Sequence, residues 1–209
     1  MACIQTLILF ARQPRLGAVK TRLARDVGAL GALRFYRTSS AGLATRLGQG
    51  IGWQTVIAIT PDRFADRPAR GRHWPSPIGL VPQGRGDLGQ RMAHAFRRRI
   101  GPVVIIGTDS PDIRRHHIKR AFQLLGHNDA VFGPALDGGY WLIGLKQPCR
   151  AGRLLRDVRW SSPHALADTL ANFSPGDRIA CLETLRDIDR GQDLLASRGA
   201  GAIRRSDAR

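Results

Sequence analysis

The chain has 209 residues and a formal net charge of +17, because 33 lysine and arginine residues outnumber 16 aspartate and glutamate residues. Hydrophobic residues make up 43% of the chain, which is ordinary for a globular protein long enough to bury a core. The apolar runs are far shorter than the roughly 20 residues that a membrane-spanning helix needs, so we expect no membrane span. No basic segment precedes the first apolar run, which therefore predicts a strand rather than a signal peptide.

Cysteine usage favours a reducing compartment. Cys3, Cys149 and Cys181 are far apart, and no CxxC pair or cysteine–histidine cluster occurs. This spacing argues against a zinc site and against a disulfide framework. We therefore expect a cytoplasmic protein.

The positive charge has two interpretations. An excess of cations favours anionic partners such as nucleotides, nucleic acid or an anionic membrane surface. Alternatively, the excess reflects a compositional bias toward arginine, since Lys20, Lys119 and Lys146 are the three lysines of the chain. Local placement of particular cations is therefore more informative than the total.

Short apolar runs alternate with helical patterns along the chain. In chain order, the patterns predict a strand over 4–11, a helix over 21–47, strands over 53–60 and 78–82, a helix over 88–99, a strand over 102–107, a helix over 114–125, strands over 129–133 and 140–145, a helix over 163–173, a strand over 178–182 and a helix over 191–197. We expect the charged end, residues 203–209, to be frayed. This alternation predicts a single α/β domain over 1–209, with a mostly parallel sheet covered by helices on both faces.

A basic loop follows the first predicted strand. Residues 12–22, RQPRLGAVKTR, hold a glycine, Gly17, and the cations Arg12, Lys20 and Arg22 immediately before a helix. Backbone N–H groups at a helix start, together with cations, form an anion site, and arginine grips phosphate through two donors. The spacing matches neither a Walker A loop nor a dinucleotide-binding fingerprint. The alternative is a solvated basic turn.

Acidic residues follow the strongly apolar strand 102–107. Asp109 opens the segment TDSPD, at the carboxyl end of a strand where ligands of parallel sheets bind. Mg²⁺ and Mn²⁺ prefer such oxygen ligands, often together with substrate phosphates. Asp187 and Asp189 lie late in the chain and could complete a metal site, although one of them could instead cap the helix that follows.

Two glycine-containing loops are further candidates for contact with a ligand. Residues 133–141, GPALDGGYW, join two strands, and the pair Gly138 and Gly139 permits close backbone approach to a ligand beside Asp137 and Tyr140. The alternative is an Asp-Gly hairpin turn. Residues 84–92, GRGDLGQRM, could border a nucleotide through Asp87, which could equally be a helix cap.

Taken together, these motifs resemble one family. FARQPRLGAVKTRLA, GDLGQRM, GTDSPD, GPALDGGYWLIGL, VRWSS and DIDRGQDL occur in the order found in a glycosyltransferase-A-like family once labelled as a domain of unknown function. Its members are called rSAM/selenodomain-associated transferases or arsenosugar-biosynthesis-type glycosyltransferases, and the resemblance covers residues 4–198. More distantly, the layout is similar to 2-phospho-lactate and molybdenum-cofactor guanylyltransferases.

The resemblance implies a three-layer α/β/α nucleotide-diphospho-sugar transferase fold with a mostly parallel, mixed sheet. It also implies that the loop 12–22 wraps nucleotide phosphates, chiefly through Lys20 and Arg22. Asp109, with Asp189 or else Asp187, would hold Mg²⁺ or Mn²⁺, and residues 137–140 would line the acceptor side. We expect Asp109 and Asp137 to be the catalytic residues.

Three functions remain open. The resemblance favours a nucleotide-sugar glycosyltransferase with a small-molecule acceptor. The strict DxD motif of many glycosyltransferases is, however, replaced by Asp109-Ser110-Pro111-Asp112, which keeps open a guanylyltransferase-like nucleotidyltransferase that uses a nucleoside triphosphate and a small phosphorylated acceptor. A regulatory protein that binds nucleotide without turnover is a third option. Nucleic-acid binding is disfavoured, because aromatics are only 6% of the chain and form no base-stacking stripe.

Overall fold

Seven strands form one mixed sheet in the order β3-β2-β1-β4-β6-β5-β7. The computed structural model describes residues 4–48, 52–65, 73–75 and 77–196. The strands are β1 (Thr6–Arg12), β2 (Gln54–Thr60), β3 (Gly79–Pro82), β4 (Val103–Ile106), β5 (Ala130–Pro134), β6 (Tyr140–Leu145) and β7 (Ile179–Cys181). All seven were predicted, with bounds that differ by a residue or two except at β6, which matches.

One strand runs against the others. β1 pairs in parallel with β2 and β4, and β2 with β3, whereas β6 is antiparallel to both β4 and β5. The carboxyl ends of β1 to β4 therefore meet the start of β6 at one edge of the sheet. Ligands of open α/β sheets bind at such an edge.

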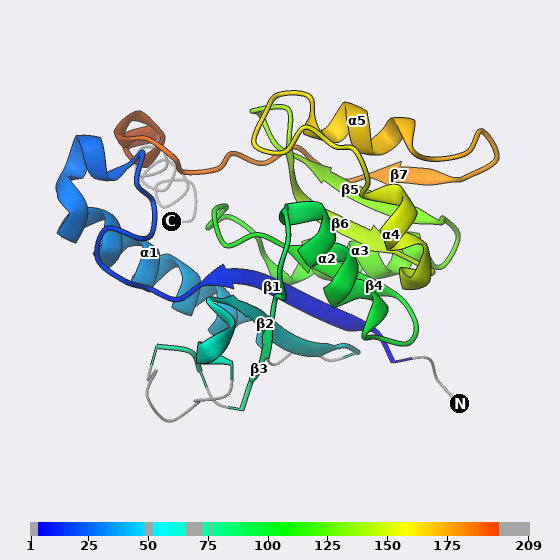
Figure 1. Cartoon of the computed structure of the whole chain (residues 1–209), viewed down its shortest axis with the longest axis horizontal. Coiled ribbons are helices and arrows are strands. Elements are labelled where there is room, and N and C mark those ends of the chain that lie inside the picture. The colour runs from blue at the N-terminus through cyan, green and yellow to red at the C-terminus, as the bar shows by residue number, and fades with distance from the viewer. Residues whose placement is uncertain (1–3, 49–51, 66–72, 76, 197–209) are drawn as a thin grey trace, which may run out of the picture.

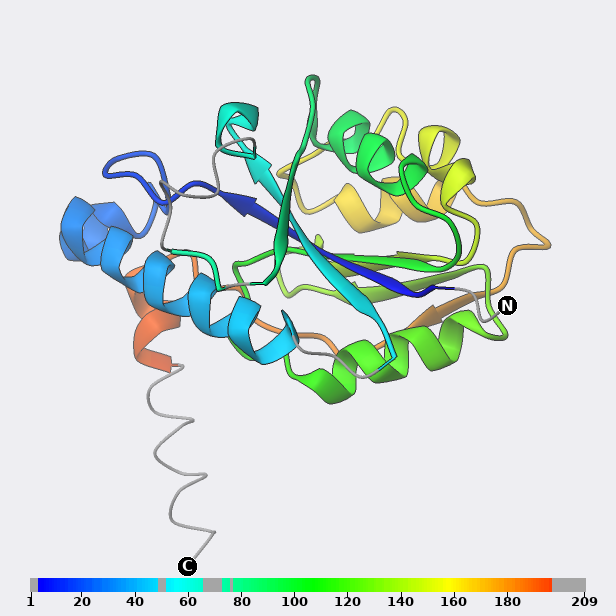
Figure 2. The ribbon, with the colours of Figure 1, turned by 90° about the horizontal axis from the view of Figure 1, so that it is seen from below.

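Helices cover both faces of the sheet, which gives three layers (Figures 1 and 2). The helices are α1 (Ala24–Gly48), α2 (Leu88–Arg97), α3 (Arg115–Leu125), α4 (Ala151–Leu154) and α5 (Ala165–Ala171). Figure 2 shows α1 and α3 on one face and α2, α4 and α5 on the other. Residues 191–196 are also helical and lie beside α1 in both views.

The central strands are buried from both sides. In β1, Leu7 and Leu9 belong to the core on the α1–α3 face, whereas Ile8 belongs to the core on the α2–α4 face. All four residues of β4 are buried. Continuous apolar runs of this kind are typical of parallel strands sandwiched between helices, because every side chain meets a helix on one face or the other.

Helix α1 departs from the predicted uninterrupted helix. Gly28 has a φ of 74° inside it, a left-handed conformation that breaks the helix. Apolar residues at helical spacing predict a buried stripe that includes Val27 and Leu30, but these two residues are 37% and 55% exposed. Beyond the break the helix turns Tyr36, Leu43 and other residues into the core.

Three short elements were not predicted: the 3₁₀ turns Asp62–Phe64 and Pro148–Arg150, and the one-turn helix α4. They are too short to show a periodic apolar pattern. The charged end, residues 203–209, lies outside the described residues, so its predicted fraying is not tested. Within the described residues, no helix has the length and apolarity to cross a membrane.

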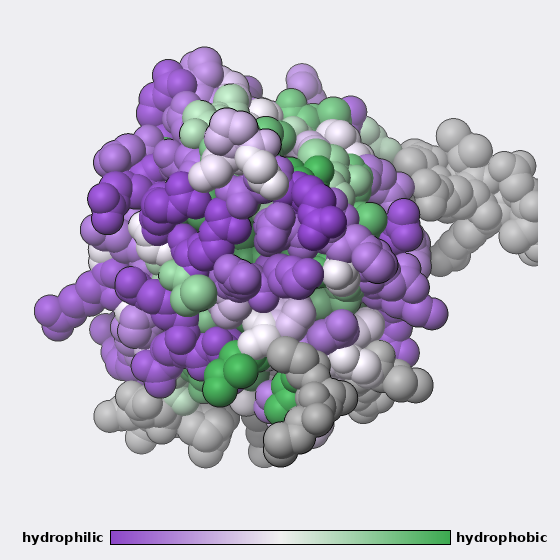
Figure 3. Space-filling model, turned by 90° about the vertical axis from the view of Figure 1, so that its right-hand side faces the viewer, coloured by the Kyte–Doolittle hydropathy of each residue, from purple (hydrophilic) through white to green (hydrophobic). Residues whose placement is uncertain are grey.

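The face drawn in Figure 3 is mostly hydrophilic, and its hydrophobic groups are interspersed among polar ones.

Candidate active site

A cavity of about 650 Å³ opens at the edge of the sheet where the carboxyl ends of β1 to β4 meet the start of β6. Its volume is within the range of small-molecule sites. Of the residues predicted for the site, the cavity is lined by Arg12, Lys20, Arg22, Asp109, Asp137, Gly139, Tyr140, Asp187 and Asp189. The fold thus brings together residues from both ends of the chain, as their placement after strands predicted.

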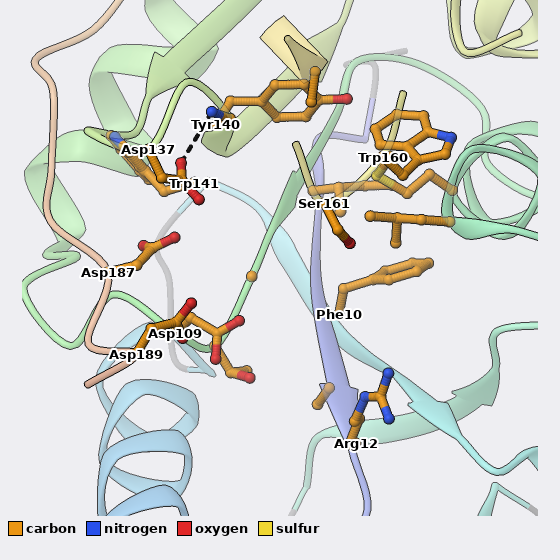
Figure 4. A pocket seen from close by; sticks show the side chains of 18 of the residues that line it. Phe10, Arg12, Asp109, Asp137, Tyr140, Trp141, Trp160, Ser161, Asp187 and Asp189 are labelled. Carbon is orange, nitrogen blue, oxygen red and sulfur yellow. Dashed lines mark hydrogen bonds between the residues drawn. The ribbon is translucent and has the colours of Figure 1, made fainter. Parts of the chain in front are cut away.

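Charges of opposite sign line the cavity in equal number. Four cations (Arg12, Lys20, Arg22 and Arg91) face the space together with four carboxylates (Asp109, Asp137, Asp187 and Asp189). In Figure 4 the carboxylates gather on one side, and Arg12 lies on the other beside Phe10. The cavity therefore carries charges of both signs and differs in this from the chain as a whole, which has a large excess of positive charge.

Lys20 joins the two aspartates that were expected to bind metal. Its Nζ lies 2.6 Å from Oδ1 of Asp109 and 2.8 Å from Oδ1 of Asp189. The Lys20 side chain is 5% exposed, whereas the Asp109 and Asp189 side chains are 50% and 40% exposed. The ammonium group therefore lies on the inner side of the pair, and the carboxylates keep contact with solvent.

The surroundings keep Lys20 charged. Burial by itself would lower its pKa, but attraction to Asp109, then to Asp189, and hydrogen bonds to both hold the pKa above its ordinary value. Lys20 also has a φ of 49°, a left-handed conformation that is rare for a residue with a Cβ atom. Backbone strain of this kind is retained most often at functional sites.

Asp189 is held in place from the C-terminal segment. The Ile188 N–H donates to the carbonyl oxygen of Asp109 at 3.1 Å, which docks this segment beside β4. The Asp193 carboxylate accepts from the N–H groups of Asp189 and Arg190 at 3.1 and 2.9 Å. The carboxylate that accepts from backbone N–H groups at the start of the last helix is therefore that of Asp193, and not that of Asp187 or Asp189.

Asp187 is the most perturbed carboxylate of the cavity. The hydroxyl of Ser110 donates to its Oδ1, and Figure 4 shows it between Asp137 and Asp109. Burial, assisted by the charge of Asp109, raises its pKa from 3.8 to about 6 against the opposing effect of the Ser110 hydrogen bond. Perturbed carboxyl groups of this kind cluster at functional sites.

Tyr36 organises the floor of the cavity, a role that the sequence patterns did not indicate. Its hydroxyl accepts from the Arg12 N–H at 2.9 Å, donates to the Arg12 carbonyl oxygen at 3.0 Å, and accepts from the Thr108 hydroxyl at 3.3 Å. Its periodic position in α1 indicated only a buried residue. These three hydrogen bonds fix the ends of β1 and β4 relative to each other. They thereby position Arg12 and also Thr108, the residue before Asp109.

The loop between β5 and β6 is a hairpin turn, as the alternative interpretation has it, and Asp137, Gly139 and Tyr140 of this segment also line the cavity. The carboxylate of Asp137 accepts from the Gly139 N–H at 2.9 Å. Gly138 has a φ of 85°, and a Cβ atom there would overlap the backbone of Pro163. Gly138 therefore lets the backbone of Pro163 pack against this turn, and it does not itself line the cavity.

An aromatic wall forms the other end of the cavity. Phe10, Leu88, Met92, Tyr140 and Trp160 line it, and Figure 4 shows Ser161 beside Trp160 and Phe10. Trp160 and Ser161 belong to the motif VRWSS, but no periodicity or charge pattern distinguished them individually.

Gln83 and Arg91 are a second pair that sequence reasoning missed. Gln83 is 2% exposed, and its amide nitrogen donates to the carbonyl oxygens of Ala11 and Ala58 at 3.0 and 2.9 Å. Its Oε1 accepts from Nη1 of Arg91 at 2.9 Å, which holds that guanidinium at the cavity. A glutamine at a strand end carries no sequence signal that separates it from a loop residue.

Two residues predicted for the nucleotide site lie elsewhere. Asp87 accepts from the Gln90 N–H at 2.8 Å and forms a capping box at the start of α2, which is the alternative considered for it. Gly17 has a φ of 73° with nothing near its Cβ position, so it serves the turn of the loop. Neither lines the cavity.

The adjacent residues His116 and His117 cannot face one ligand together on a helix, which predicts that both are surface residues, and for His117 this prediction is wrong. It is buried at the start of α3, its Nδ1 accepts from the Arg114 N–H at 3.0 Å, and its Nε2 lies 2.5 Å from Glu183. With His116, these side chains place three ligand atoms within 4.8 Å of one another, the group in the described residues that best resembles a metal site. The hydrogen bond to Nδ1, however, leaves the proton of a neutral ring on Nε2, where it donates to Glu183. A metal ion bound to Nε2 would leave the ring proton on Nδ1, so the hydrogen bond from the Arg114 N–H to Nδ1 would break.

The cavity carboxylates fit a hard divalent cation by chemistry. Asp109, Asp187 and Asp189 offer oxygen ligands only, which suits Mg²⁺ or Mn²⁺ and not a thiophilic metal. The ammonium of Lys20, between Asp109 and Asp189, shows that one cation is already accommodated there.

Solved structures with this fold provide comparisons. A protein of Desulfovibrio desulfuricans G20, described as a "putative nucleotide-diphospho-sugar transferase", is 30% identical, with 89% of this chain and 82% of that chain covered and a TM-score of 0.80. The CMP:2-keto-3-deoxy-manno-octonic acid synthetase complexed with CTP is 11% identical, with 96% and 99% covered and a TM-score of 0.58. Rv0371c of Mycobacterium tuberculosis H37Rv, in complex with manganese, is 15% identical, with 93% and 97% covered and a TM-score of 0.53.

These likenesses confirm the predicted α/β fold, which is that of nucleotide-diphospho-sugar transferase structures. Among curated proteins, none matches the chain. A family model described as "Uncharacterized protein conserved in bacteria (DUF2064)" matches residues 43–162, more than half of the chain. The protein therefore belongs to the DUF2064 family.

Proposed function

We propose that the protein is a transferase that uses a nucleotide-activated donor, and that the donor is a nucleotide sugar whose glycosyl group passes to a small-molecule acceptor. The observation that carries the proposal is the meeting of the basic loop with the carboxylates of Asp109 and Asp189 in one cavity at the edge of the sheet. The 30% identity to the Desulfovibrio protein supports it.

In this proposal Lys20 and Arg22 bind the phosphates of the donor. The Arg22 side chain is 63% exposed and lies 3.6 Å from Asp189, so it is free to turn toward a ligand. Asp109, Asp189 and Asp187 hold Mg²⁺ or Mn²⁺, which when bound neutralises charge on the phosphates. The manganese complex of Rv0371c, which shares the fold, is consistent with this assignment.

The aromatic wall has the chemistry to hold a planar ring. Phe10 and Trp160 lie across the cavity from the carboxylates, where a base or a sugar face would stack and water would be excluded (Figure 4). Asp137 is held by the Gly139 N–H beside this space. We assign it to orienting the acceptor hydroxyl and accepting its proton as the hydroxyl attacks the sugar carbon and the nucleoside diphosphate leaves.

Nucleotidyl transfer is the second candidate, because the CTP-bound synthetase has the same fold. In that reaction the acceptor attacks the α-phosphorus of a nucleoside triphosphate and pyrophosphate leaves. Both chemistries use the same cations and the same carboxylates, so the geometry alone favours neither. The balance of charges in the cavity argues against binding of nucleic acid there, since four carboxylates would meet the phosphate backbone.

The test is product formation from a panel of nucleotide sugars and nucleoside triphosphates with Mn²⁺ and a pool of small hydroxylated acceptors. Release of nucleoside diphosphate with a glycosylated acceptor supports glycosyl transfer, and release of pyrophosphate supports nucleotidyl transfer. The variant Asp109→Asn should lower turnover by about a hundredfold or more. Metal-dependent turnover that Asp109→Asn leaves intact would remove the core of the proposal. Binding of donor without any product would support the regulatory alternative.

A further inference from the structure

Lys20 occupies the position between Asp109 and Asp189 that a metal ion would need. Its Nζ contacts Oδ1 of each aspartate, at 2.6 and 2.8 Å, and its side chain is 5% exposed. By comparison, the Arg22 guanidinium approaches only Oδ2 of Asp189, at 3.6 Å, from an exposed position. Lys20 is thus the inner cation of this site, and Arg22 is an outer one.

An ammonium group and a divalent cation cannot share these two oxygens. Mg²⁺ binds oxygen at about 2.1 Å, so an ion held by the same Oδ1 atoms would lie almost in contact with Nζ. Two positive centres at such a distance repel each other strongly in a partly buried site. The carboxylates, in contrast, need to move little to bind the ion. Their Oδ1 atoms already lie 2.6 and 2.8 Å from one positive centre, Nζ of Lys20.

We propose that Lys20 is an exchangeable internal cation, whose ammonium group holds Asp109 and Asp189 together in the ligand-free protein and leaves them when a divalent cation arrives with the donor phosphates. The step in which the ammonium group moves to the donor phosphates rests on the proposed function. The step in which a divalent cation displaces it from the two carboxylates does not rest on that function.

The chain around Lys20 allows the side chain to move while the backbone stays. The neighbouring Val19 is 4% exposed, and the carbonyl oxygen of Lys20 accepts from the Ala24 N–H at 2.9 Å at the start of α1. The left-handed backbone of Lys20 is therefore anchored on both sides. Lysine carries its charge on a flexible four-carbon stem, so the ammonium can change partners by side-chain rotation alone.

The exchange has a consequence for the order of binding. In the ligand-free protein a divalent cation must displace the charged ammonium group of Lys20 from both of its carboxylate partners. When phosphates enter together with the cation, the ammonium gains new acceptors and the displacement costs less. The protein should therefore bind Mn²⁺ weakly alone and more tightly in the presence of a nucleoside diphosphate.

The test is the affinity of nucleotide-free protein for Mn²⁺, measured from the electron paramagnetic resonance signal of free Mn²⁺. Lys20→Met should bind Mn²⁺ at least about tenfold more tightly than the wild type, because it removes the competing charge. Lys119→Met, at an exposed position, is the matched control and should bind as the wild type does. Equal or weaker binding by folded Lys20→Met would overturn the proposal.

A second measurement does not depend on the folding of that variant. The chain has three lysines, so wild-type protein labelled with ¹³C at lysine Cε gives three assignable signals. Addition of Mg²⁺ with a nucleoside diphosphate should shift the Lys20 signal and leave those of Lys119 and Lys146 unchanged. An unmoved Lys20 signal at saturation would contradict the exchange. Since neither experiment measures turnover, the exchange can fail while donor transfer is still observed, and the reverse holds as well.

Discussion

Tyr36 holds Arg12 by both polar atoms of the Arg12 backbone. The Tyr36 hydroxyl accepts from the Arg12 N–H at 2.9 Å and donates to the Arg12 carbonyl oxygen at 3.0 Å, across 24 residues of chain. The last residue of β1 is thereby fixed from helix α1, at the point where the basic loop begins.

The variant Tyr36→Phe should therefore reduce both stability and donor binding. It leaves the Arg12 N–H and carbonyl oxygen without this partner, and an unsatisfied buried group costs about 1–3 kcal/mol of unfolding free energy. Chemical denaturation measures the loss. Thr108→Val, which removes only the 3.3 Å bond to the same hydroxyl, should cost less. A Tyr36→Phe protein as stable as the wild type would show that the contact positions nothing.

Gly138 and Gly17 both have positive φ angles, yet we expect their alanine variants to differ. At Gly17 nothing lies near the added Cβ atom, so Gly17→Ala should cost only the conformational strain, about 1–2 kcal/mol. At Gly138 the Cβ atom also overlaps the backbone of Pro163, so residues 158–163 must move away from the turn. Gly138→Ala should lower the melting temperature more than Gly17→Ala does. Similar losses in the two variants would contradict the packing described for Pro163.

Asp187 should make the ligand-free protein less stable at neutral pH than its asparagine variant. An aspartate with a raised pKa contributes stability that is complete below its ordinary pKa of 3.8 and is lost as the pH rises through about 6. Asp187→Asn stays neutral and keeps an oxygen that accepts from Ser110. Its advantage in melting temperature over the wild type should grow between about pH 4 and pH 6 and level off above that range. Asp112→Asn, at a side chain that is 62% exposed, is the control and should show no such growth.

Asp177 should show the opposite dependence on pH. Hydrogen bonds from Arg150, at 2.6 and 2.7 Å, and then from the Ser174 N–H hold the pKa of Asp177 below its ordinary value. Its contribution is present above the ordinary carboxyl pKa and is lost as the pH falls through the lowered value. Asp177→Asn should therefore lower the melting temperature at pH 7, with a gap that narrows in acid. A gap that is constant with pH would contradict the ion pair.

The strands were predictable because their apolar runs are short and continuous, and β4 is buried as such a run requires. Residues after those strands, such as Asp109 and Lys20, could be placed at the same edge of the sheet because the ends of parallel strands meet there. Asp189 was a weak candidate from its own motif and gained support only from the resemblance to a family, since 169 residues separate it from Lys20. That Lys20 forms ion pairs with both Asp109 and Asp189 could not be predicted, because side-chain pairing across such separations is decided by tertiary packing.

Local sequence patterns predicted a residue's role least well where its type suits two different roles. Asp87 suited a helix cap and a ligand equally, and the capping box with Gln90 decided the matter. Tyr36 showed only the spacing of a core residue, although its hydroxyl faces polar partners. Gly28 gave no signal of a break within the otherwise periodic pattern of α1.

The central claim is that the cavity binds the phosphates of a nucleotide donor together with a divalent cation. The most direct measurement is calorimetric titration of nucleoside diphosphates into the wild type and Asp109→Asn, each with and without Mn²⁺. We predict that at least one base gives binding that Mn²⁺ tightens by about tenfold or more in the wild type, and that Asp109→Asn loses this gain. Absence of binding for every base, or binding that neither Mn²⁺ nor the substitution alters, would contradict the account.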